Sequence, residues 1–248
     1  MSRAVIVVPC FNEARRLDAE AFARFAPPGH DVRFLFVDDG STDGTREALA
    51  RLALADPSRF QVLALERNRG KAEAVRRGML QALASGAEQA GYWDADLATP
   101  LEEIPRFMDL LDRRPGVEIV LGSRVALLGR SIERRAVRHY TGRVFATAAS
   151  LALRLPVYDT QCGAKLFRNT PAVAALFAEP FASRWIFDVE IVARLARARR
   201  GSSLPAPRDA IYELPLERWR DVGGSKIGVL DFPRAALQLI RIWWKHLR

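Results

Sequence analysis

Cysteine is scarce in this sequence. The chain of 248 residues has two cysteines, Cys10 and Cys162, far apart and in no paired spacing. Disulfide frameworks and cysteine metal knuckles need several closely spaced cysteines. Both classes are therefore excluded, and a reducing compartment is indicated.

Long apolar runs are also missing. No stretch approaches the roughly 18 uncharged apolar residues of a membrane span. Met1-Ser2-Arg3 leads directly into a strand-like segment, without the charged start, apolar stretch and cleavage site of a signal peptide. We therefore expect a protein that does not cross the bilayer.

Lysine is rare as well, because only four of the 38 basic residues are lysines and arginine dominates the net charge of +9. Arginine binds phosphate bidentately, so this charge suits phosphorylated substrates, anionic lipid or nucleic acid. A genome rich in G and C would give the same bias. The motifs G-x-G-x-x-G and G-x-x-x-x-G-K-[ST] are absent, as is the glycine-rich, arginine-bearing loop of sugar nucleotidyltransferases.

Short apolar strands alternate with helical patterns in the first half of the chain. Strands are predicted at residues 4–8, 32–37, 60–65, 90–93 and 117–121. Helices are predicted at residues 13–25, 45–55, 71–84 and 100–113, the last with Thr99 as N-cap and Glu102 closing a capping box. This alternation predicts an α/β fold with a mostly parallel sheet flanked by helices.

The second half breaks this rhythm. It is predicted to hold a long helix at about 132–153, a strand at 164–168, a helix at 188–199, a strand at 210–216 and a final helix from about 231. We expect one continuous domain with a first half at 1–125 and a second half at 126–248.

Acidic residues follow three of the predicted strands, where ligands of open α/β sheets bind. Asp94 and Asp96 could hold Mg²⁺ or Mn²⁺ and leave positions open for diphosphate oxygens. With 15 aspartates in the chain, one Asp-x-Asp is expected by chance, so the position carries the argument. Asp38 and Asp39 could bind the ribose or the base. Solvated turns remain the alternative at both places.

Basic residues gather in three further segments. Residues 67–71 could contact phosphate at a helix start, although a solvated loop is the commoner explanation. A second cluster comprises Arg124, Arg130, Arg134, Arg135, Arg138 and Arg143, and the stretch has an apolar face at helical spacing. The third is a C-terminal polar stripe of Arg234, Gln238, Arg241, Lys245 and Arg248, opposite Phe232, Ala236, Leu239, Ile240, Trp243 and Leu247. Basic amphipathic helices are typical of membrane surfaces, but both helices could equally pack on the core.

Taken in order, these motifs resemble the family-2 glycosyltransferases. The resemblance rests on Val8-Pro9-Cys10-Phe11-Asn12-Glu13, Val37-Asp38-Asp39-Gly40-Ser41-Thr42-Asp43, Asn68-Arg69-Gly70-Lys71 and Asp94-Ala95-Asp96. The second half is similar to the dolichyl-phosphate glucose synthase branch, through Gly122-Ser123-Arg124, residues 159–168, Trp185-Ile186-Phe187-Asp188-Val189-Glu190 and Gly224-Ser225-Lys226. Ala72-Glu73 and Ala164 depart from the family pattern, and the N-terminal membrane helix of eukaryotic glucose synthases is not seen.

This resemblance implies a GT-A, Rossmann-like fold in which residues 1–125 bind the nucleotide sugar, and residues 126–248 bind the acceptor and carry amphipathic helices at the membrane surface. It also implies an inverting transfer of a hexose, glucose from UDP-glucose, to polyprenyl or dolichyl phosphate. Asp94 and Asp96 would hold the metal, Mg²⁺ or Mn²⁺. The nucleotide sugar would be bound by Pro9, Phe11, Glu13, Asp38, Asp39, Lys71, Asp94, Ala95 and Asp96. The acceptor phosphate would be bound by Arg124, Arg138 and Lys226. The catalytic residues would be Asp96, Arg124 and Asp188, where Asp188 and Glu190 either orient substrate hydroxyls or have a structural role.

Two alternatives stay open. A family-2 enzyme using GDP-mannose or a soluble hydroxyl acceptor would need a base, for which Asp188 is the candidate. A non-catalytic basic protein bound to membranes or nucleic acid would turn over no nucleotide sugar. We expect the nucleotide sugar, the lipid phosphate and a membrane surface as partners, not nucleic acid, and a peripheral place on the cytoplasmic, inner face of the membrane. The oligomeric state is open.

Overall fold

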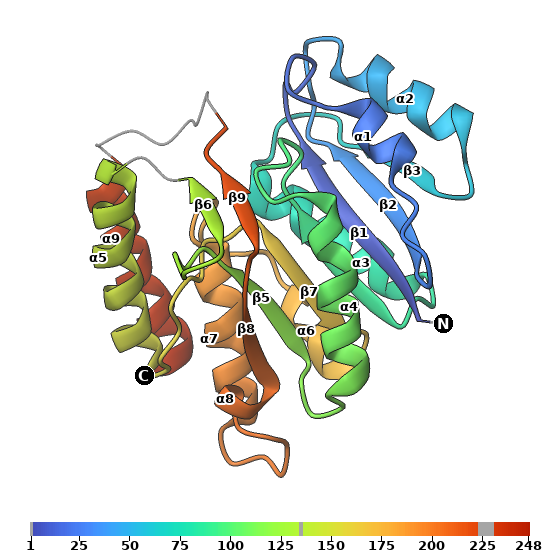
Figure 1. Ribbon diagram of the computed structural model, residues 1–248. Helices are drawn as coiled ribbons and strands as arrows, with labels where there is room; N and C mark the ends of the chain where they lie inside the picture. The colour runs from blue at the N-terminus through green and yellow to red at the C-terminus, as the bar shows by residue number, and fades with distance from the viewer. Residues whose placement is uncertain (1, 134–135, 223–230) are drawn as a thin grey trace.

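The computed structural model describes residues 2–133, 136–222 and 231–248, with the side chains of 136–141 and 231–233 left out. A seven-stranded sheet forms the centre, in the order β3-β2-β1-β4-β7-β5-β8 (Figure 1). β7 runs antiparallel to its neighbours β4 and β5, and the other pairs are parallel. The mostly parallel sheet flanked by helices is confirmed.

Most elements of the first half lie where the sequence predicts them. The strands are β1 Arg3–Cys10, β2 Asp31–Asp38, β3 Phe60–Ala64, β4 Gln89–Trp93 and β5 Ile119–Ser123. The helices α2 Thr45–Ala55 and α3 Lys71–Ala84 have the predicted bounds. β1, β4 and β5 are buried along most of their length, as expected of strands inside a sheet that is covered on both faces, whereas β3 is partly exposed and lies at the edge of the sheet.

Two predictions for the first half are wrong. The helix predicted at 13–25 is only α1 Ala19–Arg24, because the Asp18 side chain accepts from the Ala21 amide and starts the helix there. The capping box does not form either. A 3₁₀ turn, η1 Leu101–Glu103, precedes α4 Ile104–Arg113, and neither has a side-chain cap.

The second half contains the predicted elements and several that the sequence did not indicate. The predicted ones are α5 Ala136–Leu153, β7 Ala164–Arg168, α7 Phe187–Arg199, β8 Ile211–Pro215 and α9 Asp231–Ile242, which continues as the π-helical η2 Trp243–Leu247. Not predicted were α6 Pro171–Ala178, α8 Pro207–Ala210, and a separate two-stranded sheet of β6 Ser131–Glu133 and β9 Arg218–Arg220. β7 and β8 belong to the same sheet as β1 to β5.

Helices cover both faces of the sheet (Figure 1). Side chains alternate along each strand, so Ile6 and Val8 pack on one face with α1, α2 and α4, while Val5 and Val7 pack on the other with α3, α6 and α7. A third apolar cluster joins α5, α9 and η2 to the outer side of α7. These layers hold the strand ends of β1, β2 and β4 side by side at one edge.

Candidate active site

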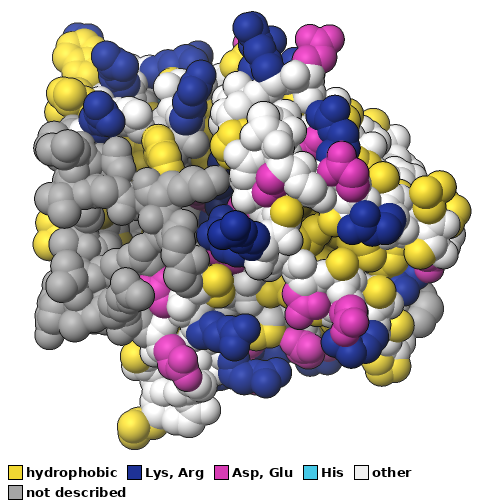
Figure 2. Space-filling model, turned by 90° about the horizontal axis from the view of Figure 1, so that it is seen from above, with side chains coloured by type: hydrophobic (Ala, Val, Ile, Leu, Met, Phe, Trp, Pro, Cys, Tyr) yellow, Lys and Arg dark blue, Asp and Glu magenta, His cyan; other side chains and the backbone are white. Residues whose placement is uncertain are grey.

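The acidic residues named from the sequence lie together at the carboxyl edge of the sheet. β1 pairs with both β2 and β4, and Cys10 is in register with Asp38. Asp94 and Asp96 directly follow β4. Figure 2 looks down on this edge and shows Lys and Arg side chains gathered there among Asp and Glu side chains.

Asp94 and Asp96 are two carboxyl groups that act on each other electrostatically at this edge. Burial, together with the charge of Asp94, raises the pKa of Asp96, and the Ala98 amide donates to its Oδ1 at 3.1 Å. Ala95, between them, is buried. Among the described residues, no group of three or more His, Cys, Asp and Glu could hold a metal. Two carboxylates suit Mg²⁺ or Mn²⁺, which take the remaining ligands from phosphate and water.

Lys71 reaches this motif from the start of α3. Its Nζ lies 2.5 Å from Asp94 Oδ1. Desolvation by the surrounding protein lowers the pKa of Lys71, but Asp94 and Asp188 outweigh it, and the net effect is a raised pKa. Lys71 is therefore charged beside Asp94, and its side chain is 43% exposed.

Asp38 and Asp39 are buried and hold the neighbouring loops. Asp38 accepts from the Ser41 amide at 2.9 Å and pairs with Arg46 at 2.8 Å. Asp39 accepts from the amides of Arg69 and Gly70 at 2.7 and 2.8 Å. The basic segment 67–71 thus gives two of its amides to Asp39 and not to a phosphate.

The balance of desolvation against hydrogen bonds shifts the pKa values of these two carboxyl groups in opposite directions. Desolvation raises the pKa of Asp39, and the bonds to two amides do not fully compensate. Desolvation also acts on Asp38, but the bonds to Ser41 and Arg46 outweigh it and lower that pKa. Asp38 is therefore a stable anion, whereas Asp39 would gain from a further donor such as a base N–H.

The end of β1 and the residues that follow it border the same space. Pro9 and Phe11 are half-buried. The carboxylate of Glu13 is buried and paired with Arg16 at 2.5 Å, and its amide donates to Thr45 Oγ1 at 2.8 Å. Glu13 therefore anchors the segment to α2, while Pro9 and Phe11 present partly open apolar surface.

Asp188 lies in the first turn of α7, and its charge is already compensated within the protein. Its Oδ1 accepts from Tyr92 Oη at 2.5 Å and from Lys165 Nζ at 2.6 Å. Lys165 is 1% exposed and Asp188 6%. The sequence analysis did not single out Lys165 and Tyr92 as site residues. Lys165 could have been noticed, because it is the one charged residue among the first four of the predicted strand 164–168.

The described contacts of Glu190 all lie within the protein. This residue is fully buried, accepts from the Ala182 amide at 2.7 Å, and pairs with Arg194 at 2.8 Å and His246 at 3.2 Å. These contacts tie α7 to the C-terminal segment.

Arg124 follows β5 and is fixed in place. Its Nε and Nη2 donate to the two oxygens of Asp159 at 2.7 and 2.8 Å, and its guanidinium lies 5.4 Å from the centre of the Trp219 ring. Burial opposes the charge of Arg124, but Asp159 outweighs it and raises the pKa. The other two residues predicted for the acceptor phosphate, Lys226 and the Arg138 side chain, lie outside the described residues.

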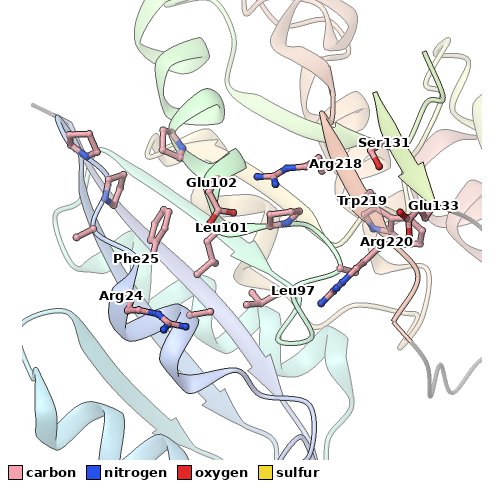
Figure 3. Close-up of a pocket in the computed structure, with 17 residues that line it drawn as sticks. Arg24, Phe25, Leu97, Leu101, Glu102, Ser131, Glu133, Arg218, Trp219 and Arg220 are labelled. Carbon is pink, nitrogen blue, oxygen red and sulfur yellow. The ribbon is translucent and has the colours of Figure 1, made fainter. Parts of the chain in front are cut away.

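A groove of about 730 Å³ opens beside this site, between α1, the segment after Asp96 and the β6–β9 sheet (Figure 3). Its apolar lining includes Phe25, Leu97, Leu101 and Trp219, and its basic lining is Arg24, Arg218 and Arg220. Leu97 follows Asp96 in the chain, and Trp219 also contacts Arg124. The groove was not foreseen, because β6 and β9 were not predicted.

The C-terminal helices have an exposed apolar face. The side chains concerned are Val144 and Leu151 on α5, and Leu237, Ile240 and Trp244 on α9 and η2, each 54–75% exposed. Leu239 and Ile242 face inward and are buried. The last helix thus has one face packed on the core and an exposed apolar face. Within the described ranges, no helix is long and apolar enough to cross a membrane.

Comparison with known proteins places the chain in a family. Glycosyl transferase family 2 matches residues 5–173. Dolichyl-phosphate beta-glucosyltransferase of Saccharomyces cerevisiae is 29% identical over 98% of this chain and 74% of its own, and that of Drosophila melanogaster is 31% identical with the same coverage. The mouse protein of this name is 32% identical over 90% of this chain and 68% of its own.

Solved structures agree in fold. Glucosyl-3-phosphoglycerate synthase from Mycobacterium tuberculosis, in complex with Mn²⁺, UDP and phosphoglyceric acid, superposes with a TM-score of 0.71 at 17% identity, covering 99% of this chain and 78% of that one. The fold is therefore the expected GT-A type. The chain belongs to the family-2 glycosyltransferases, in the branch of the dolichyl-phosphate glucosyltransferases.

Proposed function

We propose that this glycosyltransferase moves glucose from UDP-glucose to a polyprenyl phosphate such as dolichyl phosphate, with inversion at the anomeric carbon. The names of the relatives support both the sugar and the acceptor. Their products are named as β-linked, and UDP-glucose carries an α-linked sugar, so a single displacement inverts the centre.

The donor's diphosphate would lie at Asp94 and Asp96, with Mg²⁺ or Mn²⁺ between them. The ion would neutralise the charge that grows on the leaving UDP. Lys71 supplies a second positive charge at the same point, since its Nζ lies 2.5 Å from Asp94. Asp39, with Pro9 and Phe11, would contact the nucleoside.

The observation that carries the acceptor assignment is the state of Asp188. A hydroxyl acceptor needs a base near the sugar, and the candidate carboxylate is buried and already bonded to Lys165 and Tyr92. A phosphate acceptor needs no base. Its anionic oxygen forms the bond to C1 while the bond from C1 to the UDP oxygen breaks, and the electron pair leaves with UDP.

Arg124 would bind the acceptor phosphate, with Arg138 and Lys226 as proposed partners. Its Nε and Nη2 are held by Asp159, so the guanidinium is oriented before the lipid arrives. The groove beside Trp219 supplies apolar surface next to Arg124 and suits the first isoprene units.

The exposed apolar face of α5, α9 and η2 would rest on the membrane that carries the acceptor. Arg234, Arg241 and Lys245 are exposed on α9 and η2 near this face and would attract anionic lipid. We place the protein on the cytoplasmic, inner face of the membrane, as a peripheral protein.

Labelled donors test the proposal. Vesicles with polyprenyl phosphate are incubated with the enzyme, Mn²⁺ and labelled UDP-glucose, GDP-mannose or UDP-glucose plus a soluble hydroxyl acceptor. The proposal requires UDP-glucose label in the chloroform–methanol phase. Mannose label in that phase, or glucose only in the aqueous product, would replace it with one of the alternatives.

A further inference from the structure

Gly163 contacts Asp94, one of the two proposed metal ligands, so closely that no residue with a side chain would fit in its place. It immediately precedes β7, and its carbonyl accepts from the Asp94 amide at 3.1 Å. A Cβ at this position would lie 1.9 Å from Asp94 Oδ2 and 2.2 Å from Asp94 Cγ. Even alanine therefore cannot coexist with the present position of the carboxylate.

This glycine differs from those that the fold itself requires. Gly40 has a φ of +69° and would meet the Arg67 backbone at 2.6 Å, and Gly91 would meet the Lys165 carbonyl at 2.3 Å. The three atoms nearest to a Cβ on Gly163 all belong to the Asp94 carboxylate, and its φ lies outside the left-handed region. An added methyl group would therefore move a side chain and leave the backbone in place.

The Asp94 carboxylate is also bound by Lys71, whose Nζ lies 2.5 Å from Oδ1. Oδ2 faces Gly163. The carboxylate is thus bound at Oδ1 by an ammonium, and it can keep this rotation only because Gly163 has no side chain. Turning it away from Gly163 would change the position of both oxygens.

We propose that Gly163 is a positioning residue for the donor's cation: its missing side chain lets Asp94 keep the rotation in which it can bind Mg²⁺ or Mn²⁺ beside Lys71. This inference rests on the proposed function. It assigns to the second half of the chain a role in metal binding, although the metal ligands themselves lie in the first half.

The test compares Gly163→Ala, Asp94→Ala and a matched control, Gly122→Ala. The control adds the same methyl group on neighbouring β5, where a Cβ would meet Cys162 Sγ at 3.0 Å and the Ala164 carbonyl at 3.1 Å but no carboxylate. Calorimetry measures UDP binding with and without Mn²⁺, and circular dichroism checks the fold.

We expect Gly163→Ala to lose at least about tenfold in Mn²⁺-dependent UDP affinity, as Asp94→Ala does, which corresponds to about 1.4 kcal/mol. Metal-free UDP binding and Gly122→Ala should stay within about twofold of the wild type. Wild-type affinity in Gly163→Ala would overturn the inference, and so would an equal loss in the control.

A double-mutant cycle separates this inference from the proposed function. If the contact exists, Gly163→Ala lowers the melting temperature by about 3 °C in the wild type and by less in the Asp94→Ala background, because the clash is gone. Equal shifts would overturn the contact. If the wild type binds no Mn²⁺ with UDP, the proposed function fails, and the role of Gly163 in metal binding fails with it, whatever the cycle gives.

Discussion

The buried pair of Lys165 and Asp188 gives the account a quantitative test. The two charges are 2.6 Å apart, 1% and 6% exposed, and Tyr92 donates to the same carboxylate oxygen. At an effective dielectric constant of about 20, their attraction is roughly 6 kcal/mol before desolvation is subtracted. Replacing Lys165 by methionine keeps the volume and leaves the buried Asp188 without its ammonium partner.

Breaking a buried pair in this way costs about 3–5 kcal/mol. In a chain of this length, each kcal/mol lowers the melting temperature by about 2–4 °C, so Lys165→Met should melt about 6–20 °C below the wild type. The double variant Lys165→Met/Asp188→Asn removes both charges and keeps an acceptor for Tyr92. It should recover at least about half of that loss.

Calorimetry or circular dichroism measures the melting, and transfer to lipid measures activity. Because a phosphate acceptor needs no base, the double variant should keep its rate within about tenfold, whereas loss of a general base costs about 10²–10⁴-fold. The reasoning is refuted if Lys165→Met melts with the wild type, or if the stable double variant loses transfer by that larger factor.

Two further predictions concern the metal motif and the membrane face. The pKa of Asp96 is raised in the folded protein, so the folded state holds this proton more tightly than the unfolded one, and the carboxylate destabilises the ligand-free protein at neutral pH. Asp96→Asn should therefore raise the melting temperature of the ligand-free protein. It should also abolish the further rise in melting temperature that Mn²⁺ and UDP give in the wild type. In the wild type, the affinity for Mn²⁺ should fall as the pH drops through the raised pKa of Asp96. The triple change of Leu237, Ile240 and Trp244 to glutamate should weaken sedimentation with anionic phosphatidylglycerol vesicles at least about tenfold, while Leu54→Glu on the distant α2, also an exposed apolar residue, should bind as the wild type does.

Elements with a clear period could be predicted from the sequence. The bounds of α2 and α3 were predicted to the residue, because a glycine precedes each helix and Asp56-Pro57 or Ser85-Gly86 follows it. β6 and β9 could not be predicted, since each has three residues and its partner lies far away in the chain. The antiparallel direction of β7 depends on a long connection and has no local signal either.

The candidate site likewise has one part that could be predicted from the sequence and one part that could not. Asp38, Asp39, Asp94 and Asp96 could be placed together because parallel strands end at one edge of a sheet. The bonds of Asp188 to Lys165 and Tyr92, and the contact of Gly163 with Asp94, join residues distant in sequence. Only the folded chain brings those groups into contact.

Transfer of labelled glucose to lipid is the most direct test of the central claim. Purified protein, Mn²⁺, labelled UDP-glucose and polyprenyl phosphate in vesicles should give label in the organic phase that mild acid releases as glucose. Asp96→Ala and EDTA should each abolish it. If the protein is folded and the label nevertheless stays in the aqueous phase, the account is contradicted.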